Sequence, residues 1–313
     1  MSTYLITGVA GFIGSSLARA LLAQGDRVRG IDNLSTGKAE NLAAIREQID
    51  FRQADLLELK AVHDACSGVD YIFHEAAIPS VPRSVADPLE SNRANVDGTV
   101  NLLVAARDAK VKRVVYAASS SAYGDTPTLP KREDMSPHPI SPYAVAKLTG
   151  ELYMTSFWRC YGLETVALRY FNIFGPRQDP NSPYSGVLAK FITQMLRGEQ
   201  PVILGDGQQS RDFTYIDNVV SANLLACRAP GAQVAGRVFN IATGCRVDLN
   251  ETFRILKKLT GYAGDVAYGP ERTGDVKHSL ADLSLARKHL GYEPIVNFEE
   301  GLRRTIEWYR GQD

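Results

Sequence analysis

The stretch TGVAGFIG, at positions 7–14, limits the folds open to this chain more than any other. It follows a short apolar run at residues 4–7 and precedes a helical pattern at residues 15–24, which places it in a strand-to-helix turn. Glycines in such a turn let the backbone approach a pyrophosphate, and the N-terminus of the helix then faces the anion. The glycines are Gly8, Gly11 and Gly14. Their spacing is one residue longer than the usual fingerprint, but their position predicts a turn that binds a dinucleotide.

An acid at the end of the next strand-like run indicates which dinucleotide. Asp32 follows the apolar residues 28–31, where a carboxylate can accept hydrogen bonds from both hydroxyls of the adenosine ribose. The same carboxylate repels a 2′-phosphate, so we expect NAD rather than NADP. The alternative is that Asp32, with Asn33 beside it, only forms the turn at the strand end. Asp55, after the third strand, either contacts the adenine amine or caps a helix.

Strand-like and helical segments alternate through the first half of the chain. This alternation predicts an α/β fold with a doubly wound parallel sheet. After Pro176, proline, glycine and short mixed elements predict a smaller mixed α/β domain. We place the first domain at residues 1–175, with returning segments at about 214–244, and the second at 176–313. The expected strands are 4–7, 28–31, around Phe51, 69–73, 114–117, 165–168 and 239–242, and the main helices are 15–24, 92–109 and 144–161.

Composition excludes several classes of function. With 35 basic and 35 acidic residues, the chain carries no net charge that would attract nucleic acid or an anionic membrane. No apolar run is long enough to cross a bilayer, and the N-terminus enters a strand directly, so we expect no membrane association and no signal peptide. The four cysteines are scattered, which predicts neither a metal site nor disulfides and favours a cytoplasmic location.

The stretch SPYAVAK, at residues 141–147, carries the first sign of chemistry. On a helix, Tyr143 and Lys147 lie one turn apart on the same face. An ammonium beside a phenol favours the phenolate, which makes the tyrosine a usable base. The alternative is an ordinary pair on the surface. Pro142 suits the first position of a helix, where its missing N–H costs nothing.

Seven motifs, in one order and at compatible spacings, resemble those of the extended short-chain dehydrogenases/reductases. Within that family the chain is most similar to the UDP-glucose/UDP-N-acetylglucosamine 4-epimerases, from residue 2 almost to the C-terminus. The resemblance implies a Rossmann-type domain with tightly bound NAD that is regenerated in each cycle. It also implies an enzyme that inverts C4 of a UDP-hexose through a transient 4-keto sugar. The motifs are TGVAGFIG, Asp32 in GIDN, HEAAIPSVPRS, AASSSAYGD, SPYAVAK, LRYFNIFGPRQDP and SRDFTYID.

The resemblance also assigns roles in catalysis. It makes Tyr143 the catalytic base, and Lys147 the residue that binds the nicotinamide ribose and lowers the pKa of the tyrosine. Ser119, four residues before Tyr123, would hydrogen-bond the sugar O4. Related dehydratases carry Asp and Glu directly after this serine, whereas this chain has Ser120 and Ser121, so we expect no dehydration.

The binding positions follow from the same resemblance. Arg211 and Arg272 would hold the diphosphate, Asp275 the uridine ribose, and Asn172 the region between diphosphate and sugar. The implied cofactor-binding residues are Gly8, Gly11, Phe12, Ile13, Gly14, Asp32, Asn33, Asp55, Leu56, Ala76, Ala77, Tyr143, Lys147 and Tyr170. The implied substrate-binding residues are Ser80, Arg83, Ser120, Asn172, Gly186, Val187, Arg211, Arg272, Asp275 and Ser279.

Ser279 is the residue on which the expected substrate depends. Relatives restricted to UDP-glucose and UDP-galactose resemble this chain but carry a tyrosine there, whereas relatives that accept N-acetyl sugars carry a small residue. We therefore expect UDP-GlcNAc and UDP-GalNAc as substrates, with UDP-glucose and UDP-galactose as further ones. Two alternatives stay open: epimerisation or decarboxylation of a UDP-uronic acid, with Arg83 serving C6, and a non-catalytic NAD-binding protein. The helices at 92–109 and 144–161 carry more apolar surface than one sheet face needs, and in the family such helices form a four-helix bundle, so we expect a homodimer.

Overall fold

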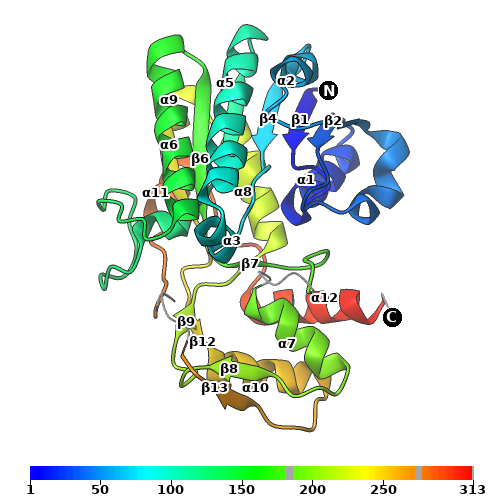
Figure 1. The fold of residues 1–313 in the computed structure, drawn as a ribbon, viewed down its shortest axis with the longest axis vertical. Helices are drawn as coiled ribbons and strands as arrows, with labels where there is room; N and C mark the ends of the chain where they lie inside the picture. The colour runs from blue at the N-terminus through cyan, green and yellow to red at the C-terminus, as the bar shows by residue number, and fades with distance from the viewer. Residues whose placement is uncertain (181–185, 272–276, 312–313) are drawn as a thin grey trace.

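The centre of the fold is a parallel sheet of seven strands, seen in a computed structural model that describes residues 1–180, 186–271 and 277–311. The order is β11-β6-β5-β4-β1-β2-β3, so the chain starts in the middle and winds outward in both directions (Figure 1). Every neighbouring pair is parallel, which confirms the doubly wound α/β fold predicted from the sequence. The strands are β1 (Thr3–Thr7), β2 (Arg27–Asp32), β3 (Asp50–Gln53), β4 (Tyr71–His74), β5 (Arg113–Ser119), β6 (Glu164–Tyr170) and β11 (Arg237–Ile241).

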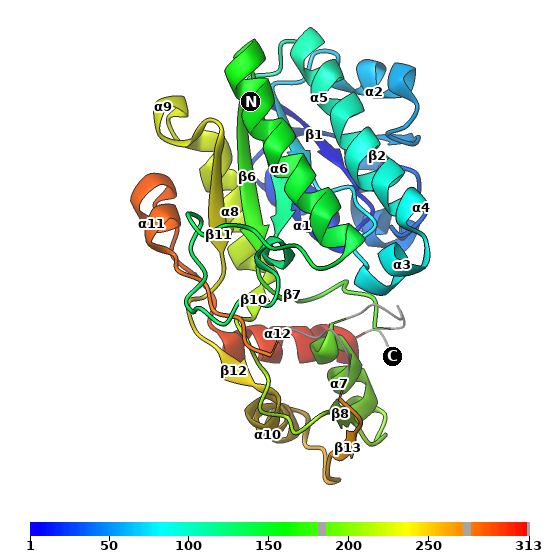
Figure 2. The ribbon, with the colours of Figure 1, turned by 60° about the vertical axis from the view of Figure 1, so that its left-hand side comes forward.

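Helices cover both faces of this sheet. Side chains alternate along a strand, and in β1 Leu5 faces one helical layer while Tyr4 and Ile6 face the other. The layer on the Leu5 side holds α2 (Leu59–Cys66), α5 (Gly98–Asp108) and α6 (Pro142–Tyr161). The opposite layer holds α1 (Phe12–Ala23) and α8 (Ile216–Arg228) (Figure 2).

The helix expected at 92–109 differs from the prediction in its first half. It begins at α4 (Pro88–Asn92), where Asp87 accepts a hydrogen bond from the backbone N–H of Glu90 at 2.9 Å. A π-helical turn, η2 (Arg93–Asp97), then leads into α5. Within this turn Asn95 is buried and its Oδ1 accepts the backbone N–H of Ile78 at 2.8 Å. Such wide turns often occur at functional sites, and this one fixes the segment that follows β4.

Most of the chain after β6 packs below the carboxyl edge of the sheet, while α8 and β11 return to the sheet (Figure 1). The assignment of residues 1–175 and 176–313 to two domains stays a prediction. The helices below the sheet are α7 (Val187–Leu196), α10 (Leu249–Thr260) and α12 (Phe298–Arg310). Three two-stranded pairs lie with them: β7 (Ile173–Phe174) with β10 (Thr214–Tyr215), β9 (Ser210–Arg211) with β12 (Val247–Asp248), and β8 (Val202–Leu204) with β13 (Ala267–Gly269). The remaining elements are η1 (Ala39–Gln48), α3 (Val81–Ala86), η3 (Ser120–Tyr123), α9 (Gly231–Val234) and α11 (Ser284–Leu290).

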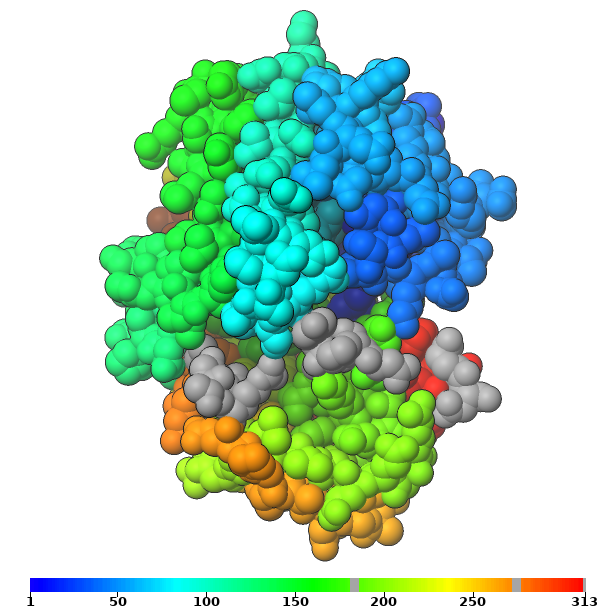
Figure 3. Space-filling view, in the orientation of Figure 1, coloured from blue at the N-terminus to red at the C-terminus, as the bar shows by residue number. Residues whose placement is uncertain are grey.

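The arrangement decides where a ligand can bind. In an open parallel sheet, ligands bind beyond the carboxyl ends of the strands. Figure 3 shows one face of the molecule, with the sheet-bearing part above and the region of α7 below. In the described ranges, no helix combines the length and the apolar character of a membrane-spanning segment. No cluster of side chains suited to a metal ion occurs in the same ranges.

Candidate active site

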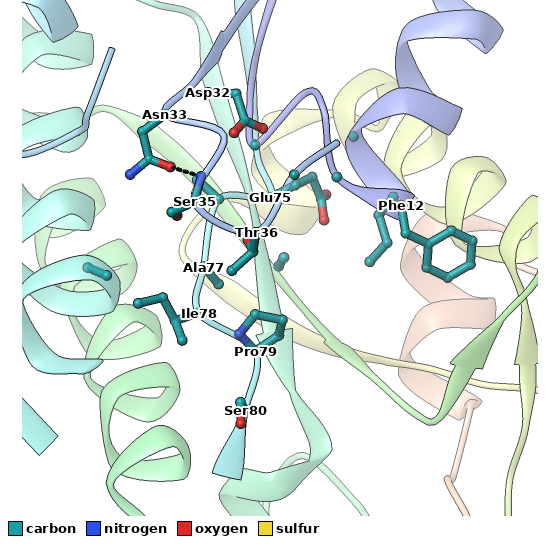
Figure 4. A pocket seen from close by; sticks show the side chains of 18 of the residues that line it. Phe12, Asp32, Asn33, Ser35, Thr36, Glu75, Ala77, Ile78, Pro79 and Ser80 are labelled. Carbon is teal, nitrogen blue, oxygen red and sulfur yellow. Dashed lines mark hydrogen bonds between the residues drawn. The ribbon is translucent and has the colours of Figure 1, made fainter. Parts of the chain in front are cut away.

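A cavity of about 1540 Å³ opens at the carboxyl ends of the strands (Figure 4). Its walls come from the turn after β1, the ends of β2, β4, β5 and β6, and the first turns of α6. Every cofactor-binding position predicted from the sequence lines this cavity. So do the three residues predicted to be catalytic, which brings all of these predicted positions into one space.

The glycine turn forms one wall. Gly8 has φ +67°, a left-handed conformation that glycine adopts without strain, and its N–H donates to the carbonyl of Ile31 at 2.8 Å. A Cβ on Gly14 would lie 2.2 Å from the carbonyl oxygen of Gly8. The turn therefore needs glycine at both positions to keep the start of α1 close to β1. Gly11 precedes α1 without any side-chain cap, so the first N–H groups of this helix remain available to an anion.

Asp32 has two functions in the structure. Its Oδ2 accepts the N–H of Ala10 at 2.9 Å, and its Oδ1 accepts the N–H of Leu34 at 2.8 Å. The second bond is the turn-forming role that the sequence left open as an alternative. Each carboxylate oxygen keeps a lone pair for a ligand hydroxyl. Burial raises the pKa of this carboxyl, and the two backbone hydrogen bonds oppose the rise.

Asn33 and Asp55 join the ends of β2 and β3. The Nδ2 of Asn33 donates to Asp55 Oδ2 at 2.6 Å, and Asn33 Oδ1 accepts the N–H of Ser35 at 3.0 Å, the bond drawn in Figure 4. Asp55 Oδ1 accepts the N–H of Leu57 at 2.9 Å. Asp55 thus closes a turn after β3. This role resembles the helix cap that the sequence left open more than the contact to the adenine amine.

Helix α6 presents the tyrosine and the lysine to the cavity. The helix begins where Ser141 Oγ accepts the N–H of Ala144 at 3.2 Å, and Pro142 occupies its first position. Tyr143 and Lys147 then lie one turn apart and both line the cavity. The local sequence therefore determines both the start of the helix and the face that carries its two polar groups.

Lys147 is held firmly. Its Nζ donates to the carbonyl of Ala117 at 2.8 Å and lies 4.9 Å from the centre of the Tyr116 ring. Only 3% of its surface is exposed. Burial lowers the pKa of Lys147 to about 8, and the carboxylates of Glu75 and Glu151 oppose that change.

The pKa of Tyr143 differs from the expectation. Burial raises it to about 12, and the opposing contribution comes from the hydrogen bond of Ser119, not from Lys147. Ser119 Oγ accepts both the N–H of Ser121 at 3.2 Å and its hydroxyl at 2.9 Å. The hydroxyl proton of Ser119 is therefore left to point toward the phenol. The expected lowering of the tyrosine pKa by the lysine is not found.

The lining residues that the sequence analysis did not predict include two charged side chains with polar contacts in the cavity wall. Glu75 ends the run after β4, and its Oε1 accepts the hydroxyl of Tyr170 at 3.0 Å. Arg177 has φ +70° and donates from Nη2 to Ser16 Oγ on α1 at 3.1 Å. The available signals were an acid inside the apolar stretch FHEAA and the arginine in GPRQDP.

The predicted substrate positions are more scattered than the cofactor positions. Ser80, Arg83 and Asn172 line the cavity, whereas Ser120, Gly186, Val187, Arg211 and Ser279 are not among its lining residues. Arg272 and Asp275 lie outside the described residues.

Several of these positions have structural contacts of their own. Ser80 caps α3 by accepting the N–H of Arg83 at 3.1 Å, and Arg83 Nε donates to Glu90 at 2.9 Å. Arg211 donates to the carbonyl of Lys277 at 3.1 Å. Gly186 and Val187 form the start of α7.

Ser279 is tied to Asn172, which does line the cavity. The Nδ2 of Asn172 donates to Ser279 Oγ at 3.1 Å, and the N–H of Asp212 donates to the same oxygen at 3.3 Å. Ser279 is not itself a lining residue of the cavity, but its hydrogen bond to Asn172 places it next to a residue that is.

Comparisons with known proteins agree with this geometry. The model of the NAD dependent epimerase/dehydratase family matches residues 4–242. The UDP-glucose 4-epimerase of Mycolicibacterium smegmatis is 39% identical over 312 residues, which covers 98% of each chain. A solved UDP-N-acetylglucosamine 4-epimerase from Methanobrevibacter ruminantium, in complex with UDP-N-acetylmuramic acid, is 43% identical with a TM-score of 0.95, over 100% of this chain and 99% of that one. A solved UDP-glucose 4-epimerase from Thermotoga maritima, with UDP-glucose, is 40% identical with a TM-score of 0.94, over 99% of both chains.

Proposed function

Since the chain belongs to the NAD-dependent epimerase/dehydratase family, we propose that it interconverts UDP-GlcNAc and UDP-GalNAc by inversion at C4, using Ser119, Tyr143 and Lys147. The family, the NAD cofactor and the enzymatic nature predicted from the sequence are confirmed by the family model and by relatives that are UDP-sugar 4-epimerases. One observation carries the proposal. The three side chains from β5 and α6 line the same cavity as the glycine turn, which puts an acid/base group beside a dinucleotide site.

The residues present fit NAD. Gly14 lets α1 start directly against the turn at Gly8, where a Cβ would clash with the Gly8 carbonyl, and the uncapped start of α1 supplies N–H groups to an anion. The Nε of Arg177 is buried and has no hydrogen-bond partner among the described residues, which suits an anion near α1. Gly8, Gly14, the start of α1 and Arg177 would hold the pyrophosphate, and Asp32 the adenosine ribose.

The chain's own residues supply the proton chemistry. When bound, NAD would supply the hydride acceptor for C4 and the hydride donor for the return to the opposite face of the sugar, with no net change of the cofactor over a cycle. Tyr143 removes the proton from the 4-hydroxyl and later gives it back, acting first as base and then as acid. In the structure the hydroxyl proton of Ser119 points toward the phenol, and with substrate bound it would turn to the same sugar oxygen and align it. Lys147, fixed by the carbonyl of Ala117, brings a positive charge to the pocket.

The turn after β5 argues against dehydration. Elimination of a sugar hydroxyl needs further acid/base groups, but Ser120 and Ser121 offer only hydroxyls near neutral pH. In the structure the N–H and the hydroxyl of Ser121 both donate to Ser119 Oγ, so Ser121 orients the proposed catalytic serine.

The N-acetyl preference rests on Ser279. A small side chain beside Asn172 leaves space for the C2 acetamido group as the keto sugar turns over, whereas a phenol would occupy that space. Arg211, Arg272 and Asp275 remain proposed anchors of the nucleotide. The uronic acid alternative has less support, because the Arg83 that would serve a C6 carboxylate is already paired with Glu90.

Two broader expectations belong to the same proposal. Val145, Leu152 and Tyr161 on α6 are large apolar side chains exposed to between 49% and 63%, which fits a homodimer through this helix. All four cysteines are free thiols, which fits the reducing cytoplasm expected as its location.

The test is direct conversion. Purified protein is incubated separately with UDP-GlcNAc, UDP-glucose and UDP-glucuronate, and the products are identified by NMR, with carbon dioxide measured in parallel. Formation of UDP-GalNAc at a rate equal to or above that of UDP-galactose supports the proposal. Conversion of UDP-glucuronate alone, with or without carbon dioxide, would replace it with the uronic acid reaction.

A further inference from the structure

Glu75 is an acid that the proposed mechanism does not use. It follows β4, and its carboxylate lies at the cavity on the side of Phe12 (Figure 4). Oε1 accepts the hydroxyl of Tyr170 at 3.0 Å, and Tyr170 accepts a bond from Asn223 at 2.7 Å. Oε2 is buried, with no hydrogen-bond partner among the described residues. A buried carboxylate oxygen without a hydrogen bond is costly unless a group of opposite charge lies nearby.

Lys147 is the cation that lies beside this carboxylate. His74 pairs with Tyr116 in the register of β4 and β5, so the next residues, Glu75 and Ala117, lie side by side, and Lys147 Nζ donates to the carbonyl of Ala117 at 2.8 Å. Glu75 and Lys147 also line the same cavity.

Two acids, Glu75 and Glu151, act electrostatically on the ammonium of Lys147. Glu151 is already held by Arg169 through two bonds of 2.9 and 2.7 Å, and both side chains of that pair are buried. Within the described part of the chain, Glu75 forms no such pair. It is therefore the acid whose charge is free to balance Lys147.

We propose that Glu75 is a positioning residue that serves as the counter-charge of Lys147 and keeps this ammonium protonated inside the pocket. The inference rests on the roles proposed above for Tyr143 and Lys147. A lysine that lost its proton here would bring no positive charge to the pocket and would keep two N–H donors in place of three. Glu75 acts on the reaction through Lys147 by opposing that loss.

The titration of the two groups agrees with the geometry. Burial raises the pKa of Glu75 to about 7, with Tyr170 and Lys147 opposing, and burial lowers that of Lys147 to about 8. Glu75 is charged above its pKa and Lys147 below its own, so both charges are present together between about pH 7 and 8. Below that window Glu75 gains a proton, and above it Lys147 loses one.

The other groups that face this pair keep their charge across that window. Burial raises the pKa of each tyrosine and lowers that of the histidine to about 3, so all of them are neutral. The remaining acid and base neutralise one another as an ion pair. These groups are Tyr143 and Glu151 on α6, Tyr116 on β5, His74 on β4, and Tyr170 and Arg169 on β6.

The experiment measures Lys147 directly. The full-length protein, as purified with its cofactor, is labelled at the lysine ε-carbons and titrated by NMR, with the Lys147 signal assigned by its absence in Lys147→Met. In Glu75→Gln we expect the Lys147 midpoint to fall by about one pH unit relative to the wild type, the size of effect of a nearby opposite charge. Glu75→Asp keeps the negative charge but moves it farther from Lys147, so the Lys147 midpoint should fall by less than in Glu75→Gln.

A matched control separates this from a general effect of losing a buried acid. Burial also raises the pKa of Glu133, which accepts the N–H of Asn240 at 2.7 Å and does not act on Lys147. Glu133→Gln should leave the Lys147 midpoint where it is. An unchanged midpoint in Glu75→Gln would overturn the inference. If that variant does not fold, an unchanged midpoint in Glu75→Asp has the same force.

A pH profile gives the second readout. The rate in Glu75→Gln should lose the acid limb near pH 7, while its alkaline limb moves to lower pH; a purely structural role would lower the rate equally at every pH. The two proposals can fail separately. If the Lys147 midpoint shifts in Glu75→Gln but the wild type epimerises no UDP-sugar, the proposed function is rejected and the pairing of Glu75 with Lys147 stands. If the wild type epimerises a UDP-sugar but the midpoint does not shift, the pairing is rejected and the proposed function stands.

Discussion

Replacing Asp32 by asparagine separates the two functions of this residue. The carboxylate accepts the N–H of Ala10 through one oxygen and that of Leu34 through the other, so it ties the glycine turn to the turn after β2. An asparagine side chain is nearly isosteric but has a single acceptor oxygen. One of the two N–H groups would then face an amide NH₂ and remain unsatisfied.

The size of the effect follows from these two bonds. A hydrogen bond to a charged group contributes about 1.5–3 kcal/mol, and a buried donor without a partner costs about 1–3 kcal/mol. Asp32 is only 8% exposed, and burial raises its pKa, so relief of carboxylate desolvation offsets part of the loss. We expect a net destabilisation of about 1–2 kcal/mol. At about 2–4 °C per kcal/mol for a large domain, the melting temperature should fall by about 2–8 °C.

Urea and thermal unfolding measure this loss, and calorimetry with NAD and NADP measures the second function. The variant should bind NAD more weakly and discriminate less against NADP, because the charge that repels a 2′-phosphate is gone. Asn33→Ala is the matched control, since it removes the neighbouring exposed bond to Asp55 and keeps the carboxylate. An unfolding midpoint equal to that of the wild type would refute the structural argument. An unchanged preference for NAD would refute the electrostatic one.

Three further predictions concern the proposed reaction and the proposed dimer. Tyr143→Phe should keep the fold and the bound NAD but lower kcat at least ~100-fold, as checked by steady-state kinetics; turnover like that of the wild type would remove the phenol from the mechanism. Ser279→Tyr should slow epimerisation of UDP-GlcNAc at least ~10-fold, or about 1.4 kcal/mol, while UDP-galactose is still converted. The control Ser279→Ala loses the bond to Asn172 but adds no volume, so it should not slow epimerisation of UDP-GlcNAc in this way. A parallel loss of both activities in the tyrosine variant would contradict the pocket assignment. Light scattering at micromolar concentration should give twice the monomer mass, because α6 exposes Val145 and Leu152; a monomer would contradict the dimer.

The cofactor half of the site could be predicted from the sequence because its residues follow strand ends directly. Once β1 and β2 were recognised from short apolar runs, the rule that ligands bind beyond the carboxyl ends placed Gly8 and Asp32 together, and the family resemblance added Ser119 at the end of β5. The same patterns found the strands to within a few residues. They missed the π-helical turn at residues 93–97, because its wider winding depends on Asn95 bonding to Ile78, a contact between separate segments.

The pKa shifts of the groups in the pocket could not be predicted from the sequence for a similar reason. The Tyr-x-x-x-Lys spacing suggested that the lysine would lower the pKa of the tyrosine, but burial outweighs every neighbour and raises it. Burial of Tyr143 results from the packing of α6 against β5 and β6, which no local pattern reports. Glu75 was missed because its importance lies in the nearness of Lys147 and Tyr170, which belong to different elements.

The substrate side was harder to predict because one buried acid organises it. Asp212 is fully buried, and its carboxylate accepts bonds from the N–H and hydroxyl of Thr243, at 2.9 and 2.7 Å, from Gly244 at 3.1 Å and from Ala281 at 3.2 Å. Its own N–H donates to Ser279, so segments far apart in the chain meet at this residue. Separate bonds hold Tyr143 and Lys147: the N–H of Tyr143 donates to Ser84 on α3, and Lys147 donates to Ala117 on β5. Substitutions at Ser279 can therefore change which sugar is accepted while the acid/base chemistry stays in place.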